Sequence, residues 1–385
     1  MYKKIGLLAV FVVLTLSIAS SASAAGEGRY LIKSNSIFIR NAFSTRHIFD
    51  NGFTADVGDT QLRLLKFLNV EFEPVEKFHI LEPVSQIEPE NKRLGSGKNT
   101  RPIPSDQTPW GIETIYNDIL VSSTNSGASV SVAVLDTGVL KTHPDLKNRV
   151  AQCKDFTLRL SVTDGKCDDK NGHGTHVSGT ILADGGADKL GIYGVAPEAK
   201  LFSYKVCDNS GSCWADDIAS AIRLAADNGA NVLNMSFGSD SPSQLIIDAI
   251  NYGVSKDVLF VGAAGNDGPY AESIDYPGAN VNVVAVGAIN PSFLVPDWSS
   301  RGINDKTTPF VNEEKDIEFG APGVNVESTW KNGGYAILSG TSMATPHIVG
   351  LAAKLWKFDA LEGERAAATR NLLHTLVKDI WDFGD

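Results

Sequence analysis

The stretch VAVLDTGV at residues 132–139 is an apolar run that ends in the turn-forming tripeptide Asp-Thr-Gly. A run of Val, Ala and Leu without polar alternation is typical of a strand that is buried on both faces of a sheet. More runs of this kind follow, and helical patterns alternate with them. This alternation predicts an α/β fold in which a parallel sheet is flanked by helices, giving three layers. The expected strands are 130–135, 201–206, 232–236, 258–263 and 283–286, and the expected helices are 173–183, 216–228, 242–254 and 342–358.

Three short segments contain the residue types of a nucleophilic hydrolase: VAVLDTGV supplies Asp136, NGHGTHVSGT supplies His173, and SGTSMATP supplies Ser342. A serine hydroxyl needs a base within hydrogen-bond reach and a carboxylate that orients this base. Asp136 should end its strand at the sheet edge where α/β sheets bind ligands, and Ser342 should begin a helix whose N-terminus presents amide donors. Each residue also has an ordinary explanation as a turn residue or helix cap. A metal site at His173 and His176 is another alternative, but the His-Glu-x-x-His spacing of such sites is missing.

The strings D-T-G, H-G-T-H-x-x-G-T and G-T-S-M-A-x-P, in this order, resemble those of the subtilisin-like serine proteases, the subtilases. The resemblance implies an endopeptidase that hydrolyses extracellular proteins, with Ser342 as nucleophile, His173 as base and Asp136 as its orienting carboxylate. His176 would then bond internally. Asn266 in GAAGNDG resembles the asparagine that stabilises the oxyanion in this family, with the Ser342 backbone N–H as its partner.

The resemblance extends to a substrate cleft. NMSFGS at 234–239 resembles one wall of the primary specificity pocket, residues 263–265 would form the opposite wall, and an extended peptide would bond to strand-like edges. The residues assigned to substrate binding are Ser210, Gly211, Ser236, Phe237, Gly238, Ala263, Ala264 and Gly265. Asp275 is expected at the pocket base, where a carboxylate favours a basic residue before the scissile bond, although a loop aspartate is usually only solvated.

The segment LADGGADKLGIYGVAP at 182–197 resembles the calcium loop of the family, which implies a structural Ca²⁺. Calcium takes six to eight oxygen ligands. The assigned ligands are the carboxylates of Asp106, Asp145 and Asp188 and the carbonyls of Leu190 and Ile192. A second, weaker set is Asp164, Asp168 and Asp169. Solvated surface is the alternative for such acidic loops.

The N-terminal part has its own organisation. Residues 1–25 contain two lysines, an apolar run and a small-residue stretch, which predicts a secretory signal peptide; the run is short for a membrane anchor, which needs roughly 20 residues. Residues 26–100 show short amphipathic stretches around a helical pattern at 60–68, which predicts a small α+β module, with a polar linker to about residue 107. By resemblance this module is a propeptide that assists folding and then inhibits the enzyme; an accessory domain that stays attached is the alternative. Residues 108–385 would form the catalytic domain, which ends earlier than related domains usually do.

Composition limits the partners and the compartment. A formal net charge of -11 argues against nucleic acid or an anionic membrane as a partner. Local pairing of the four cysteines gives Cys153–Cys167 and Cys207–Cys213, although three connectivities exist and a zinc site is a rival with unsuitable spacings. Together with the resemblance to the subtilases, these observations lead us to expect a secreted, monomeric enzyme without a membrane anchor, whose partners are protein substrates and its own propeptide. The alternatives are a non-catalytic binding protein on the same scaffold and a kexin-like processing protease.

Overall fold

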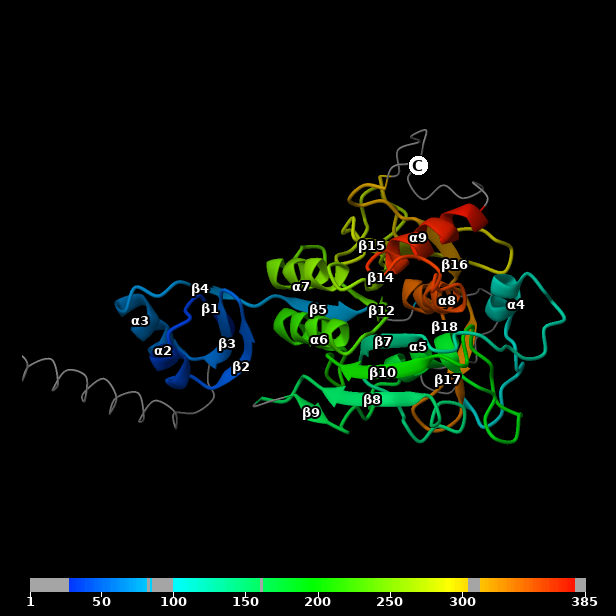
Figure 1. The fold of residues 1–385 in the computed structure, drawn as a ribbon, viewed down its shortest axis with the longest axis horizontal. Helices are drawn as coiled ribbons and strands as arrows, with labels where there is room; N and C mark the ends of the chain where they lie inside the picture. Colours follow the sequence, from blue (N-terminus) through cyan, green and yellow to red (C-terminus); the bar gives the residue numbers. More distant parts are fainter. Residues whose placement is uncertain (1–27, 82–83, 85–99, 160–161, 304–311, 378–385) are drawn as a thin grey trace, which may run out of the picture. The chain divides into compact units, whose positions relative to one another are not determined.

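The computed structural model describes residues 28–81, 84, 100–159, 162–303 and 312–377 (Figure 1). The chain divides into two compact units: Met1–Glu76 with Leu158–Val162, and Lys77–Thr157 with Thr163–Asp385. The predicted signal peptide at 1–25 lies outside the described residues. None of the helices in the described ranges combines the length and the apolar character needed to span a membrane.

The first unit is a four-stranded antiparallel sheet with two helices. The strand order is β2-β3-β1-β4. The elements are β1 (Gly28–Ile32), α2 (Ile37–Asn41), β2 (Thr45–Phe49), β3 (Gly52–Val57), α3 (Asp59–Phe67) and β4 (Phe72–Pro74). Ile32, Phe53 and Leu65 are buried in one cluster between the sheet and α3. The module is therefore α+β, but its hairpin of β2 and β3 has no clear signal in the sequence.

The second unit contains an eight-stranded sheet in the order β16-β15-β14-β12-β7-β10-β8-β9, parallel except for β9. The strands are β7 (Ser131–Asp136), β8 (Val150–Asp155), β9 (Thr163–Asp164), β10 (Lys200–Lys205), β12 (Val232–Met235), β14 (Leu259–Ala263), β15 (Val283–Ile289) and β16 (Phe319–Pro322). The helices are α4 (Trp110–Tyr116), α5 (His173–Leu182), α6 (Ala215–Asp227), α7 (Gln244–Val254), α8 (Thr341–Lys354) and α9 (Arg365–Leu376). One three-stranded sheet has the order β11 (Ser212–Trp214), β5 (Lys77–Ile80) and β13 (Phe237–Gly238). A second has the order β17 (Val326–Thr329), β18 (Tyr335–Leu338) and β6 (Thr100–Arg101).

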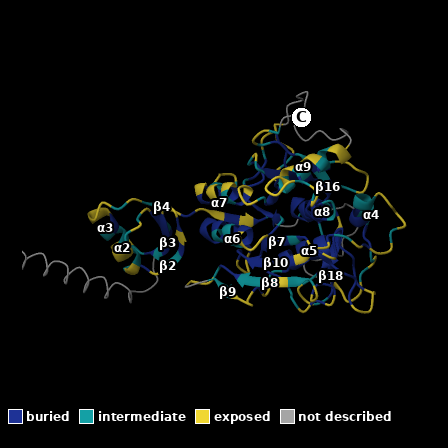
Figure 2. Cartoon of the chain, in the orientation of Figure 1, coloured by how far each residue is buried: buried dark blue, intermediate teal, exposed yellow. Residues whose placement is uncertain are grey.

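Helices cover both faces of the large sheet, and its central strands are buried (Figure 2). Val261 of β14 shares a hydrophobic cluster with Val177 of α5 and Val349 of α8. The preceding Phe260 faces the other way, because a Cβ on Gly253 of α7 would lie 2.4 Å from its ring. The helix α6 packs against α7. The predicted three-layer α/β architecture is thus confirmed.

The expected elements differ from the observed ones mainly at their ends. Each predicted strand is found within a few residues of its expected limits. The helix expected over 242–254 begins at Gln244, since Ser243 and not Ser241 is its N-cap and Pro242 precedes it. The helix expected over 342–358 ends at Lys354.

The order in which the chain adds strands to the sheet reverses at β7. From β7 the chain first builds β8 and β10 on one side, and then crosses to build β12, β14, β15 and β16 on the other. Open α/β sheets bind ligands at such a reversal, at the carboxyl ends of the strands. Asp136 is the last residue of β7.

Candidate active site

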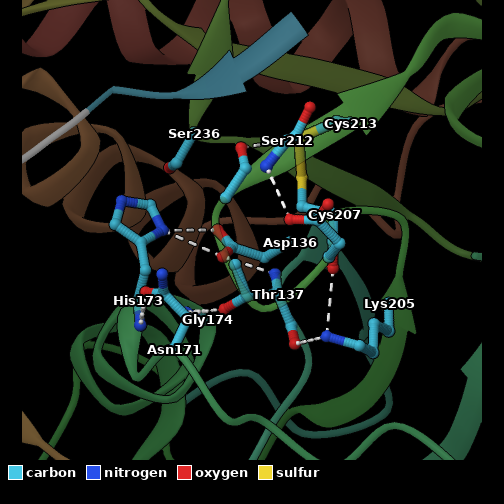
Figure 3. Close-up of a disulfide and its surroundings, with 12 residues drawn as sticks. Asp136, Thr137, Asn171, His173, Gly174, Lys205, Cys207, Ser212, Cys213 and Ser236 are labelled. Atoms are coloured by element: carbon cyan, nitrogen blue, oxygen red, sulfur yellow. Dashed lines mark hydrogen bonds and ion pairs between the residues drawn. A yellow bond between two sulfur atoms is a disulfide. The ribbon is translucent and has the colours of Figure 1, made fainter.

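Asp136 and His173 form a hydrogen-bonded pair at the carboxyl end of β7 (Figure 3). The two Asp136 carboxylate oxygens lie 2.9 and 3.0 Å from His173 Nδ1. Both side chains are 1% exposed. Their close approach depends on Gly174, because a Cβ there would lie 3.1 Å from Asp136 Oδ1 and 2.2 Å from the Gly138 carbonyl oxygen. A carboxylate on Nδ1 fixes the orientation of the imidazole and keeps Nδ1 protonated.

Asp169 organises the backbone around this pair. Its carboxylate is buried and accepts hydrogen bonds of 2.7 to 3.0 Å. The donors are the Thr137 hydroxyl, the backbone N–H groups of Asn171, Gly172 and Thr175, and the Thr175 hydroxyl. One side chain thereby joins the residue after Asp136 to the first turn of α5, which begins with His173.

Ser342 and Asn266 lie together at the start of α8. Asn266 Oδ1 accepts hydrogen bonds from the backbone N–H and the hydroxyl of Thr341, both at 3.0 Å. The NH₂ end of this amide is therefore the end that can donate, and its Nδ2 lies 3.5 Å from the position of a Cβ on Gly340. Ser342 is fully buried, and its Oγ donates to the Ser236 carbonyl at 3.1 Å. The Asn266 amide is thus held at the start of α8, by the residue that precedes Ser342.

A strand of the same chain lies between the predicted peptide-binding edges. β5 pairs antiparallel with both β11 and β13, with Phe78 opposite Cys213 and Ile80 opposite Phe237. The Ile80 backbone N–H donates to the carbonyl of Gly211 at 2.9 Å. The edges at 210–211 and 236–238 therefore contact an extended segment.

The bound segment continues past the serine. The carbonyl oxygen of Leu81 lies 3.5 Å from Ser342 Oγ. Three residues later, the Val84 backbone N–H donates to the Ser339 carbonyl at 2.8 Å. The segment thus has backbone contacts on both sides of Ser342.

Two side chains of β5 are matched by aromatic partners. Phe78 and Phe237 are fully buried, and their rings meet edge to face with centroids 6.3 Å apart. Lys77 Nζ lies 4.3 Å above the Trp214 ring. Such contacts stabilise the strand beyond its backbone bonds.

Both predicted disulfides are confirmed: Cys153–Cys167 and Cys207–Cys213. The second bridge closes one peptide-binding edge into a short loop (Figure 3). Within that loop, Asp208 Oδ1 accepts hydrogen bonds from the backbone N–H groups of Ser210 and Ser212, at 2.8 and 3.0 Å. Ser210 therefore turns the loop and is bound to Asp208.

Lys205 connects this loop to the Asp136 turn (Figure 3). Its Nζ donates to the Thr137 carbonyl at 2.6 Å and to the Cys207 carbonyl at 3.0 Å. Burial lowers the pKa of Lys205, although Asp169 and other nearby carboxylates oppose this effect. The buried cation fixes two carbonyls that belong to different segments.

The second wall, residues 263–265, is anchored beside Ser342 as well. The Gly265 backbone N–H donates to the Thr341 hydroxyl at 3.2 Å. The Ala264 carbonyl accepts from the backbone N–H of Asp275 at 2.8 Å. Ala263 ends β14 and is fully buried.

His176 has an internal role. Its Nε2 lies 3.0 Å from the Val326 carbonyl oxygen and 3.2 Å from that of Ala336. Burial lowers the pKa of His176 to about 3, and the nearby His173 contributes. The neutral ring joins α5 to β17 and β18.

Part of the predicted calcium set is brought together. The position of a Cβ on Gly186 is 3.0 Å from Asp145 Oδ1 and 3.3 Å from Asp188 Oδ1. Asp145 Oδ1 is buried without a hydrogen-bond partner, whereas Oδ2 accepts from the Ile192 N–H at 2.9 Å and the Tyr335 hydroxyl at 2.8 Å. A buried carboxylate oxygen without a donor suits a cation.

The remaining acidic candidates have other contacts. Asp106 accepts a hydrogen bond from the backbone N–H of Thr108 at 3.0 Å, while the adjacent Gln107 donates to the carbonyls of Lys189 and Gly191. The second set is not assembled, because Asp169 binds the backbone around Asp136 and His173 and the Asp164 carboxylate pairs with Lys154.

Comparison with known proteins gives concordant matches. A sequence model described as the subtilase family matches residues 127–381. The chain is 43% identical over 354 residues to "Subtilisin" from Bacillus sp. (strain TA39), covering 87% of this chain and 82% of that protein. It is 36% identical over 359 residues to "M-protease" from Shouchella clausii (strain KSM-K16), covering 90% and 85%. Among solved structures, "Sphericase" is 50% identical with a TM-score of 0.67, covering 70% of this chain and 89% of that one.

Proposed function

The chain belongs to the subtilase family and is a serine endopeptidase that hydrolyses peptide bonds of protein substrates, and on this premise we propose that Asp136, His173 and Ser342 perform the reaction. Ser342 Oγ attacks the carbonyl carbon, and His173 Nε2 accepts the hydroxyl proton and then gives it to the leaving amine. Asp136 stabilises the imidazolium that forms. The Asn266 amide and the Ser342 backbone N–H donate to the oxyanion, and water then hydrolyses the acyl-enzyme.

We further propose that the protein is a zymogen that cuts itself. The supporting observation is the backbone of β5 between β11 and β13, with the Leu81 carbonyl oxygen 3.5 Å from Ser342 Oγ. A strand added to an exposed edge is a common way to bind a peptide. The segment that precedes the catalytic residues in the chain therefore occupies the cleft as a substrate would.

The bond on the carboxyl side of Leu81 is the first bond cut in this proposal. Ser342 Oγ bonds to the Leu81 carbonyl carbon, the C–N bond breaks, and the next residue leaves as an amine with the proton from His173. Water releases the Leu81 carboxylate and restores the serine. Until β5 leaves, its backbone blocks other substrates, and later cuts remove the linker to about residue 107.

Calcium is the proposed structural cofactor. Asp145 and Asp188 would bind it together with the carbonyls of Leu190 and Ile192, because their oxygens suit a hard cation. The buried Asp145 Oδ1 without a donor supports this choice. The ion would stabilise the loop and take no part in the bond cleavage. Asp106 remains a proposed ligand on sequence grounds alone.

We also propose that the protein is secreted and acts as a monomer. The proposal of secretion depends on the sequence of residues 1–25, with its lysines, apolar run and small residues. The disulfides are consistent with an oxidising compartment.

The test compares the full chain with its Ser342→Ala variant. The wild-type chain should release an N-terminal fragment whose last residue is Leu81, identified by mass spectrometry, and should then digest a denatured protein. Ser342→Ala should remain uncut and inactive, because no nucleophile forms the acyl-enzyme.

Ser292→Ala is the matched control, since Ser292 is exposed and distant in sequence from the proposed triad. It should process and digest like the wild type. Equal processing and digestion by Ser342→Ala would refute the catalytic assignment. A first fragment with another terminus would refute only the Leu81 assignment.

A further inference from the structure

Asp275 and Tyr276 are hydrogen-bonded to both walls of the predicted specificity pocket. The Asp275 backbone N–H donates to the Ala264 carbonyl at 2.8 Å, on one wall. Tyr276 and Ser239 exchange both backbone hydrogen bonds, at 2.9 and 3.0 Å, on the other wall. These two consecutive residues therefore span the space between the walls.

The Asp275 carboxylate lies against both walls. A Cβ on Gly238 would lie 2.5 Å from Asp275 Oδ2, and one on Gly265 would lie 2.8 Å from it. A glycine on each wall thus leaves room for the carboxylate. The Asp275 side chain is 4% exposed, and within the described ranges no group donates a hydrogen bond to it. A buried carboxylate without a donor requires a ligand or a proton.

Two further carboxylates face Asp275. Asp240 follows β13 and Asp267 follows β14, and one oxygen of each of the three lies within 4.8 Å of the others. Burial, together with the negative charges of Asp267 and Asp240, raises the pKa of Asp275 to about 7. The nearby charged and titratable groups have other partners: the Tyr276 hydroxyl donates to Glu314, and Arg301 Nη1 donates to the Ser299 carbonyl.

The register of β5 relates Asp275 to the cut bond. Ile80 lies opposite Phe237, so Leu81, the next residue, lies alongside Ser236. Ser236 accepts the hydrogen bond from Ser342 Oγ. Leu81, which precedes the scissile bond, is therefore adjacent to the wall at 236–238. Gly238 of this wall is the glycine that lies against the Asp275 carboxylate.

We propose that Asp275, supported by Asp240 and Asp267, is a specificity-determining residue that selects Lys or Arg as the residue before the scissile bond. The proposal rests on the peptidase function assigned to the cleft. A substrate cation would donate charge-assisted hydrogen bonds to Asp275 and offset the repulsion among the three carboxylates. With Asp275 protonated, the same pocket accepts an apolar side chain such as that of Leu81.

The experiment uses the processed enzyme and two peptide substrates that differ only in the last residue of the cleaved sequence, Phe-His-Ile-Leu and Phe-His-Ile-Lys. The ratio of kcat/KM for Lys over Leu is measured from pH 5 to pH 9. A pH effect on the bond-breaking step itself is shared by both substrates and cancels in the ratio. In the wild type, the ratio should rise as pH increases through about 7, the pKa to which Asp275 is raised, because deprotonation creates the anion.

Asp275→Asn keeps the side-chain shape and removes the charge. At pH 9 it should lower the Lys-over-Leu ratio by about ten- to hundred-fold, through a higher KM for the Lys peptide. Its ratio should not change with pH. Asp248→Asn is the control, because Asp248 is exposed on α7 and accepts a hydrogen bond from Gln244 of the same helix.

A wild-type ratio that is flat with pH, or an Asp275→Asn ratio equal to that of the wild type, would overturn the proposal. The three carboxylates could also bind a metal, so the ratio is measured with and without added calcium at constant ionic strength. A ratio that falls to the Asp275→Asn value on calcium addition would assign the cluster to the ion. Hydrolysis of either peptide by Ser342→Ala would instead contradict the proposed triad and leave the selectivity question separate.

Discussion

Asp169 has a larger hydrogen-bonding role than its position in the sequence indicates. Its carboxylate holds the Thr137 hydroxyl and the first turn of α5, so it fixes the distance between the segments of Asp136 and His173. The sequence alone groups Asp169 with Asp164 and Asp168 as a possible calcium ligand, because an acidic loop that binds a cation and one that accepts backbone hydrogen bonds have the same residue types. Sequence spacing alone does not identify an acceptor for backbone groups.

Replacing Asp169 with Asn should therefore slow the reaction. The amide group replaces one acceptor oxygen with a donor, and this leaves buried N–H groups without a partner. We expect kcat to fall about ten- to hundred-fold with little change in KM, and the free energy of unfolding to fall by about 2 kcal/mol. Kinetics should be measured at temperatures below the thermal unfolding transition of the variant. A loss of kcat then reports on the positions of Asp136 and His173 and not on the fraction of folded protein.

Asp168→Asn provides the comparison, because that side chain is exposed. It should match the wild type in both measurements. If Asp169→Asn lost stability but kept its full kcat when folded, Asp169 would be only a structural residue.

At the scale of elements, the long apolar runs predicted the strands and helices of the central sheet. Their side chains are buried on both faces, so the runs are continuous and readily seen. The sequence does not predict that the short strands β5, β11 and β13 form one sheet. Each strand has two to four residues, and β5 is separated from both of its partner strands by more than 100 residues of sequence. Similarly, the pairing of Asp136 with His173 followed from motifs, but the contacts of Asp275 required the fold.

The attachment of α9 to β16 is another feature without a sequence signal. Glu318, next to β16, is 1% exposed and binds both Arg370 and His374 of α9. Burial alone would raise the pKa of Glu318, but hydrogen bonds from His374 and Arg370 outweigh it and lower the pKa. A lowered carboxyl pKa means that the ion pair stabilises the fold above the usual Glu pKa and loses this effect as pH falls.

Glu318→Gln should thus destabilise the protein by about 3 kcal/mol at neutral pH, because it leaves the Arg370 cation without its counter-charge. The difference from the wild type should shrink in acid, below about pH 4, as the wild-type carboxyl is protonated. Denaturant unfolding at several pH values measures both effects. Glu362→Gln, at an exposed site, should change neither the stability at neutral pH nor its dependence on pH. A stability difference between Glu318→Gln and the wild type that grew in acid would contradict the ion pair of Glu318 with Arg370.

At the scale of the whole molecule, the loop at residues 182–197, where we propose a calcium site, connects distant parts of the chain. Asp145 bonds to Ile192 within the loop and to Tyr335 of β18. An ion bound to Asp145 and Asp188 would add to these links only in the folded state. Ligand binding of this kind stabilises a protein by about 3 kcal/mol at a hundred-fold excess over Kd.

Removal of calcium with a chelator should consequently lower the unfolding temperature, and added calcium should restore it. The readout is thermal unfolding of Ser342→Ala, so that self-digestion does not interfere. Asp145→Asn should abolish the response to calcium, whereas Asp164→Asn should preserve it. An unfolding temperature that is the same with and without chelator would rule out the proposed site.

The strand in the cleft also determines how activity would develop with time. While β5 is joined to the cleft through the chain, its effective concentration is set by the tether, at about millimolar or more, and dilution has no influence. After a cut at Leu81, occupancy of the cleft by β5 would depend on protein concentration, because only non-covalent contacts such as that of Phe78 with Phe237 would then hold the strand. Each molecule that loses its strand can digest the strands released by others. The onset of activity in a population would therefore be sigmoidal, with a lag that shortens as protein concentration rises.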